Sequence, residues 1–293
     1  MTGEYLEVRH PGPLATVQDL GRHGMACLGV GVAGAADLTS LRLANRLVGN
    51  GEGHAAIEVT LGGFEIRASA AITVAITGAP CPMTVDGRAV GMNAPVRVPP
   101  DGLLRLGPPT QGLRSYIAVR GGIDVPPVLG SRSTDTLSGL GPEPLRTGTR
   151  LPIGQPQAPL PAVDLAPVAA LPAEPALRVI PGPRDDWFTQ EALSVLCAQP
   201  YQVGSDSNRV GVRLSAPQPL ARKVSGELPP EPMVLGALQV PPSGQPILFL
   251  ADHPVTGGYP VIAVVTAADL HHAAQVRAGQ RVRFRQLRTR ACR

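Results

Sequence analysis

The chain is poor in aromatic side chains, in lysine and in long apolar runs. Its 293 residues contain only one Trp, four Tyr and four Phe, too few to form platforms on which nucleic-acid bases stack. Lys223 is the only lysine and no G-x-x-x-x-G-K-[ST] pattern occurs, which excludes a conventional P-loop. No apolar run reaches the roughly 18 residues that a membrane-spanning helix needs. We therefore expect no nucleic-acid partner and no membrane partner.

Closely spaced cysteines are also lacking. Cys27, Cys81, Cys197 and Cys292 are too far apart in the sequence for the usual metal-ligand or redox motifs. The chain does not begin with a charged segment followed by an apolar one, as a secretory leader would. These features predict a reduced, cytoplasmic protein.

Positive charge is concentrated at one end of the chain. The formal net charge is +4, but residues 277–293 contain seven Arg and no acid, so the rest of the chain is slightly acidic. A basic tail on such a body favours a solvated C-terminal face over a nucleic-acid site. Within it, residues 281–285 alternate between Arg and apolar side chains, which predicts a half-buried strand.

Glycine and proline are abundant, at 34 and 33 residues, which indicates many turns and excludes a helical bundle. Helical periodicity predicts helices only near residues 37–48, from 185 or 186 to 197 or 198, and at 267–276. Short apolar or alternating runs predict strands at 71–77, 103–106, 116–119, 177–180, 247–251, 261–265 and 281–285. The composition therefore predicts a mainly β protein with a few helices, built as barrels or sandwiches.

Nine prolines fall within residues 152–183, where neither a helix interior nor a central strand would tolerate them. We interpret residues 156–176 as a linker between an N-terminal half, 1–155, and a C-terminal half, 177–293. An extended strap packed across one half would have the same composition, so both interpretations stay open.

Two N-terminal motifs could bind an anion. Residues 29–34 (GVGVAG) match G-x-G-x-x-G and precede a predicted helix, but no apolar strand leads into them, which argues against dinucleotide binding. A simpler anion site at the helix N-terminus remains possible. Residues 131–135 (SRSTD) combine hydroxyls with a guanidinium, which suits a carboxylate or another anion. The same residues would also suit a turn that satisfies its own backbone.

A loop at residues 251–260 (ADHPVTGGYP) gathers an acid, an imidazole, a hydroxyl and a phenol between two predicted strands. Loops on rigid strands are frequent locations for binding and catalytic groups. Residues 239–246 and 207–214 are further candidates, although spacing alone assigns them no chemistry. His271 and His272 are adjacent and lack an H-E-x-x-H pattern, so we predict no metal site.

Several blocks, in order along nearly the whole chain, resemble the carboxyltransferase subdomain A and B family. This family includes allophanate hydrolase subunit 2, Kip-type regulators and the C subunit of 5-oxoprolinase. The matching blocks are 16–22 (TVQDLGR), 43–50 (LANRLVGN), 118–123 (AVRGGI), 129–134 (LGSRST), 239–244 (QVPPSG) and 256–260 (TGGYP).

The resemblance implies two cyclophilin-like β-barrel domains and an enzyme that is active only with partner subunits. One implied partner has subdomains C and D, like the Kip inhibitor and the B subunit of 5-oxoprolinase. The other is a lactam-utilisation protein of the A type. The implied reaction is ATP-dependent opening of 5-oxoproline to glutamate, with ATP bound by the assembly. Two alternatives are a biotin-dependent carboxyltransferase or allophanate hydrolase component, which would need biotin, and a non-catalytic Kip-type regulator.

By residue type and resemblance, we expect Asp252, Arg132 and Arg209 to be catalytic. We expect the substrate to be bound by Gln239, Thr256, Gly257, Gly258, Tyr259, Ser133 and Thr134. The sequence departs from the family's usual pattern in both C-terminal motifs. Asn208 stands where an acid is common, and His253, Pro254 and Val255 replace three polar residues. These departures favour an altered substrate or a site that is only partly used.

Overall fold

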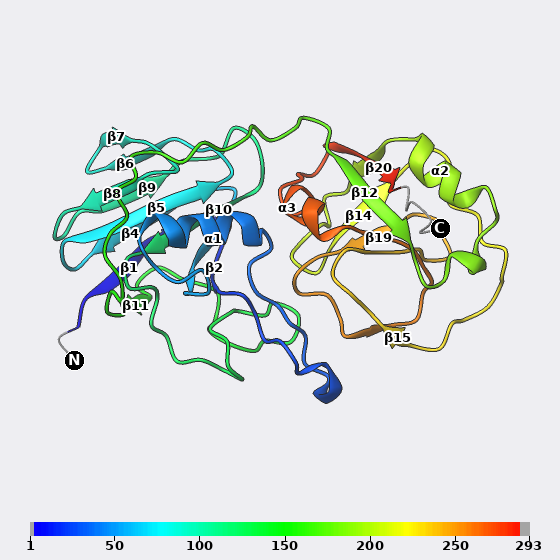
Figure 1. Ribbon diagram of the computed structural model, residues 1–293, viewed down its shortest axis with the longest axis horizontal. Coiled ribbons are helices and arrows are strands. Elements are labelled where there is room, and N and C mark those ends of the chain that lie inside the picture. The colour runs from blue at the N-terminus through cyan, green and yellow to red at the C-terminus, as the bar shows by residue number, and fades with distance from the viewer. Residues whose placement is uncertain (1–2, 288–293) are drawn as a thin grey trace, which may run out of the picture. The chain divides into compact units, whose positions relative to one another are not determined.

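Short strands joined by glycine-rich turns make up most of the chain in the computed structural model (Figure 1), which describes residues 3–287. Within this range the chain forms two units, one of residues 3–25 and 32–171 and one of 26–31 and 172–287. Each unit has its own hydrophobic core. The last three arginines of the basic tail, Arg288, Arg290 and Arg293, lie outside the described residues, as does Cys292.

Two antiparallel sheets form the first unit. The six-stranded sheet has the order β11 (Arg150–Pro152), β1 (Tyr5–Pro11), β4 (Phe64–Ala68), β9 (Leu103–Leu106), β6 (Met83–Val85), β7 (Arg88–Val90). The five-stranded sheet has the order β2 (Leu14–Gln18), β3 (Ala56–Thr60), β10 (Arg114–Val119), β5 (Ile72–Gly78), β8 (Pro95–Val98). A single apolar cluster takes side chains from both sheets, so the two sheets share one core.

The first unit also contains the helix α1 (Leu38–Leu47), which packs on β5 and β10. Leu41 and Ala44 bury one face of this helix against Ala75, Tyr116 and Ala118. The carboxylate of Asp37 caps its first turn by accepting from the Ser40 backbone N–H. The helix predicted at residues 37–48 is therefore confirmed.

A closed seven-stranded barrel forms the second unit. Its order is β12 (Ala176–Pro181), β19 (Val261–Val265), β16 (Ala237–Gln239), β17 (Ile247–Phe249), β14 (Gly211–Ser215), β13 (Tyr201–Val203), β20 (Arg281–Gln286). β12 and β20 pair in parallel, and the other barrel pairs are antiparallel. On β20, Val282 and Phe284 are buried, as the alternating pattern predicts. The mainly β prediction is thus confirmed. A small ladder, β15 (Glu231–Pro232) with β18 (Thr256–Gly257), lies outside the barrel.

The other two predicted helices are shorter than expected. The first divides into a 3-10 turn, Asp185–Trp187, and α2 (Ala192–Ala198). Phe188 interrupts it because its side chain is buried in the barrel core and its backbone bridges to Arg222. The second is a 3-10 turn, Ala267–Asp269, followed by α3 (Leu270–Ala273). A third 3-10 turn spans Ala26–Leu28.

The proline-rich segment packs on the first unit up to residue 171 and contains no regular strand or helix between residues 156 and 171. Arg120 donates to the carbonyl of Ala158 at 2.5 Å, and the Ala166 N–H donates to Asn93 O at 2.8 Å. Ala166 also packs against the apolar cluster beside α1. Residues 156–171 therefore match the strap interpretation. In the described part of the chain, no helix is long and apolar enough to cross a bilayer.

Candidate functional site

In the first unit, the serine-rich segment is organised around the carboxylate of Asp19. We call Asp19, Gly21, Ser131, Arg132 and Ser133 the Asp19 cluster. The hydroxyls of Ser131 and Ser133 each donate to Asp19 Oδ1 at 2.6 Å. The backbone N–H groups of Gly21 and Arg132 donate to Oδ1 and Oδ2 at 2.8 and 2.6 Å. Four donors thus converge on one carboxylate.

The charge of Asp19 is stabilised in this position. Burial alone would raise the pKa of the carboxyl, but the hydrogen bonds from Ser131, Ser133 and the two backbone groups outweigh it and lower the pKa below its usual value. The two serine hydroxyls face a negative charge and are committed to it as donors. Ser133, which we expected to contact the substrate, instead donates its hydroxyl proton to Asp19.

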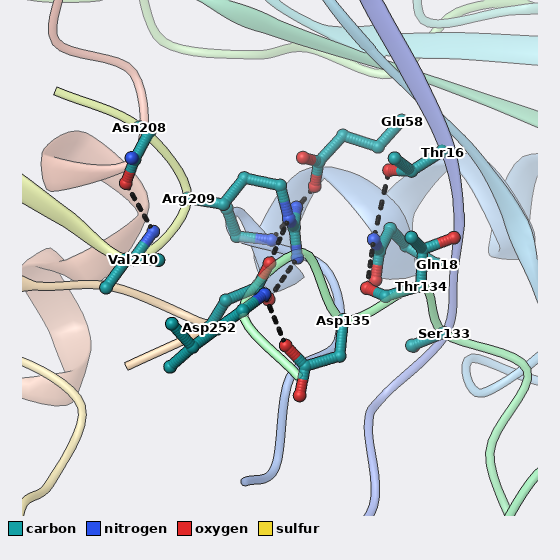
Figure 2. Close-up of polar contacts among 12 residues, drawn as sticks. Thr16, Gln18, Glu58, Ser133, Thr134, Asp135, Asn208, Arg209, Val210 and Asp252 are labelled. Carbon is teal, nitrogen blue, oxygen red and sulfur yellow. Dashed lines mark hydrogen bonds and ion pairs between the residues drawn. The ribbon is translucent and has the colours of Figure 1, made fainter. Parts of the chain in front are cut away.

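Thr134 lies next to this cluster and shares a buried polar line with β2. Figure 2 shows Gln18 between Thr16 and Thr134: its amide nitrogen donates to Thr16 Oγ1 and to the Thr134 carbonyl, each at 3.0 Å. Among the described residues, Gln18 Oε1 and Thr134 Oγ1 are buried without a hydrogen-bond partner. Buried polar atoms usually have partners. These two atoms could therefore receive a water molecule or a polar ligand group.

Arg132 extends away from Asp19 into a separate pocket of the first unit. Its Nε donates to Val125 O at 2.7 Å and its Nη2 pairs with Asp124 at 2.8 Å. The pocket has a volume of about 430 Å³, and His54 and Gln155 also line it. Both partners of the ion pair are partly exposed, so the guanidinium remains within reach of a ligand.

A second buried network in the first unit joins Glu58, Tyr116 and Arg114. The Tyr116 hydroxyl donates to Glu58 Oε2 at 2.7 Å and accepts from the Asp37 N–H at 2.7 Å. Arg114 Nε lies 3.5 Å from Glu58 Oε1, and both side chains are almost fully buried. Burial, reinforced by the Glu58 carboxylate, raises the pKa of Tyr116 well above its usual value. Tyr116 therefore stays protonated and acts as a donor.

The same network occupies the backbone N–H groups at the N-terminus of α1, where an anion could otherwise bind. Backbone N–H groups at the helix start already have protein acceptors: Glu58 for Ala36, the Tyr116 hydroxyl for Asp37, and the Asp37 carboxylate for Ser40. Two of these acceptors are acidic side chains, which oppose a second anion. The geometry does not support phosphate binding by the glycine-rich residues 29–34.

In the second unit, Arg209 and Asp252 form a fully buried, bidentate ion pair. Arg209 Nε donates to Asp252 Oδ2 and Nη2 donates to Oδ1, both at 2.9 Å (Figure 2). The two side chains come from the turn before β14 and the loop after β17. The structure thus brings together two of the three residues expected to be catalytic. In the same turn, the Asn208 side chain accepts from the Val210 N–H at 2.8 Å, a role that an acid could also fill.

The expected substrate loop of the second unit is tied to β16. Gln239 is buried, and its amide donates to the carbonyl of Tyr259 at 3.1 Å. A Cβ on Gly257 would come within 2.6 Å of the same amide, so a side chain there would displace Gln239. Thr256 of β18 pairs with Pro232 of β15. The Tyr259 side chain is 45% exposed. Gln239, Gly257 and Tyr259 therefore lie together.

His253, His271 and His272 belong to no metal-binding group among the described residues. His253 Nδ1 lies 2.8 Å from Pro254 O, and the rings of His271 and His272 are in contact, with centroids 3.9 Å apart and planes tilted by 39°. Within residues 3–287, no group of three or more His, Cys, Asp or Glu side chains could hold a metal ion.

Sequence reasoning misses Asp19, Gln18 and Glu58 as site candidates. Asp19 and Gln18 lie within a motif, residues 16–22, that serves in the sequence only to recognise the family. Their partners in residues 131–134 are more than one hundred positions away in the sequence, so no local pattern indicates these contacts. The closest available signal is the pairing of that motif with the serine-rich block at 129–134.

The carboxyltransferase domain, subdomain A and B, matches residues 28–286, and the chain belongs to this family. The C subunit of 5-oxoprolinase from Escherichia coli (strain K12) is 40% identical over 286 residues, which is 96% of this chain and 91% of that protein.

Two solved structures show the same fold at similar identity. TTHA0988 has a TM-score of 0.86 and 36% identity, over 97% of this chain and 56% of that one. The K. lactis urea amidolyase has a TM-score of 0.89 and 31% identity, over 97% of this chain and 19% of that one. The chain therefore spans about half the length of the first and a fifth of the second. The family occurs both in separate subunits and as one region of longer chains.

Proposed function

We propose that this chain is a subunit of a hetero-oligomeric, ATP-dependent 5-oxoprolinase-type amidohydrolase, which opens the lactam ring of 5-oxoproline to glutamate. The observation that carries the proposal is the match to the C subunit of 5-oxoprolinase, which extends over nearly the full length of both chains.

In this proposal the partners are a protein with subdomains C and D and a lactam-utilisation protein of the A type. ATP is assigned to the assembly, where it would supply the free energy that activates the lactam carbonyl toward water. This chain lacks a P-loop pattern, and its glycine-rich loop precedes a helix start that is already satisfied. We therefore name no nucleotide-holding residue in the first unit.

The proposed roles of the candidate residues follow their geometry. Asp252 holds the Arg209 guanidinium in a fixed orientation, and a fixed cation can stabilise negative charge that develops on the substrate. Arg132 is a second candidate cation in its own pocket. Gln239, Thr256, Gly257, Gly258 and Tyr259 are the proposed substrate contacts of the second unit, and Ser133 and Thr134 those of the first.

The proposal is tested by co-expressing the chain with both proposed partners and measuring glutamate and ADP from 5-oxoproline and ATP. We expect both products in equal amounts from the complete assembly. A stable assembly that forms no glutamate would contradict the proposal. In the active assembly, Asp252→Asn should lower turnover by about two orders of magnitude or more, because Arg209 loses the carboxylate that fixes its orientation. Near-normal turnover would remove Asp252 from the mechanism.

A second candidate function is supported by the structural match to urea amidolyase. In that case the chain would act in carboxyl transfer with biotin carried by another protein. The two candidates differ in the test above, because a carboxyltransferase component would require a biotinylated carrier and would release no glutamate from 5-oxoproline.

A further inference from the structure

A pocket of about 460 Å³ lies on the second unit. It is lined by residues 219–226 and by the turn at 242–244, which belongs to one of the family blocks. Backbone hydrogen bonds fix both walls. Leu220 N–H donates to Gly244 O at 2.9 Å, and Lys223 N–H donates to Trp187 O at 2.8 Å. The pocket is therefore built on anchored backbone.

Arg222 is the residue that gives this pocket its chemistry. Its Nη2 donates to the carbonyl of Val240, and its guanidinium carbon lies 5.7 Å from the centre of the Tyr259 ring. Its Nε is buried and has no hydrogen-bond partner among the described residues. A buried donor without a partner is costly, and a cationic one favours a charged acceptor.

The remaining lining supports the same ligand charge. Among the described residues that line the pocket, Arg222 and Lys223 are cationic and none is acidic. Ser225 and Ser243 add hydroxyl groups, which can donate to an anion. Lys223 also lines a second pocket that contains Asp185 and Asp186, so Arg222 is the main source of positive charge for an anion here.

We propose that this pocket binds the oxyanion of a small molecule, a carboxylate or a phosphoryl group, with Arg222 as the primary ligand and Lys223 and Ser243 as secondary donors. The pocket also lies close to the candidate substrate loop. Arg222 contacts Tyr259, and the carbonyl of Tyr259 accepts from Gln239, so an anion on Arg222 adjoins the candidate substrate loop. The proposal concerns binding by this chain and does not depend on the 5-oxoprolinase assignment.

The single lysine provides a direct probe. Acylation of the Lys223 amine by an excess of a neutral reagent can be followed by mass spectrometry on the full chain, with the N-terminal amine as internal control. We expect inorganic phosphate, 5-oxoproline or ADP to slow acylation of Lys223 severalfold without slowing the N-terminal amine. Protection by 5-oxoproline alone would identify a carboxylate site, and protection by phosphate and ADP a phosphoryl site. No protection by any of the three would overturn the proposal.

Variants then test the assigned donors, with whichever of the three compounds protects. Arg222→Gln should weaken its binding at least tenfold by calorimetry, and Ser243→Ala should weaken it less. Arg281→Gln, which changes an exposed arginine on β20 of the same unit, is the matched control and should bind normally. If Arg222→Gln does not fold, the exposed Lys223→Gln replaces it. Equal affinity in the Arg222 or replacement variant and in the control would contradict the assignment.

Discussion

Asp19 illustrates how single residues are held here by partners that are distant in the sequence. Its hydrogen-bond donors include Ser131 and Ser133, and Arg209 is paired with Asp252 across 43 positions. The sequence predicted Arg209 and Asp252 as candidate catalytic residues, and the structure places the two side chains in one ion pair. It could not predict that Asp19 organises the serine-rich segment, because hydroxyl groups suit an anion site and a carboxylate acceptor equally well.

Replacing Asp19 tests the importance of this carboxylate for stability. Asp19→Asn removes the charge and presents an amide N–H where a backbone N–H now donates, so we expect a loss of about 2 kcal/mol or more in the free energy of unfolding. Urea unfolding near neutral pH measures it. Asp124→Asn is the control, because its ion pair with Arg132 is partly exposed and should contribute less than about 1 kcal/mol. Equal losses in both variants would contradict the assigned role.

The lowered pKa of Asp19 also predicts that the stabilisation by its carboxylate depends on pH. The pKa of Asp19 is lower in the folded chain than its usual value of 3.8, so the stabilisation is complete above that value and is lost as the pH falls through the folded-state pKa. The stability difference between wild type and Asp19→Asn should therefore shrink in acid. Paired urea titrations over a range of acidic pH measure it. A difference that stays constant below the usual pKa would show that charge is not the cause.

The buried pair of the second unit predicts a non-additive result. Arg209→Met leaves Asp252 buried without its main cationic partner and should cost about 3–5 kcal/mol. The double variant Arg209→Met with Asp252→Leu removes both charges and should recover much of that loss. Urea unfolding of the two single variants and the double variant gives the coupling energy. Additive losses would show that the pair is not a coupled unit.

At the scale of elements, periodic patterns succeeded where one packing requirement dominates. The helix at 37–48 and the strand at 281–285 follow the burial of one face, which the sequence encodes directly. The single helix predicted from residue 185 or 186 was wrong: the segment is divided into a turn and a helix, because the buried Phe188 adopts an extended conformation. The sequence alone could not decide whether the proline-rich segment is a linker or a strap, because composition does not indicate what the segment contacts.

Capping of α1 can be tested by substitution. Asp37→Ala removes the acceptor for the Ser40 N–H and hydroxyl and should lower the stability by about 1 kcal/mol or more. Asp37→Asn keeps an acceptor oxygen and should recover part of this loss. Thermal unfolding monitored by circular dichroism measures both variants. If alanine and asparagine are equally tolerated, the cap does not stabilise the helix.

The close approach of Gly121 to Gly154 can be tested by substitution. Gly121 has φ +96°, and a Cβ there would lie 2.0 Å from the carbonyl oxygen of Gly154. Gly121→Ala should therefore destabilise the first unit by more than Gly148→Ala, which has φ +87° but open space around the new methyl group. The control isolates the backbone strain, about 1 kcal/mol, from the clash. Equal effects, measured by urea unfolding, would contradict the close approach.

At the scale of the whole molecule, the sequence predicted a mainly β chain of this family, and the fold and the comparisons confirm it. Residue blocks spread along the chain carried that prediction, because family motifs depend on order and identity. The physical patterns alone would have stopped at barrels or sandwiches. They could not choose between a closed barrel and two packed sheets, and the chain contains one of each.

The proposed activity belongs to an assembly, so leaving this chain out of the assembly shows whether the chain is needed. ADP release is measured with 5-oxoproline for the complete assembly and for the same mixture without this chain. We expect substrate-dependent ADP release, with matching glutamate, only when the chain is present. Equal turnover without the chain, or a stable complete assembly with no 5-oxoproline-dependent ADP release, would contradict it.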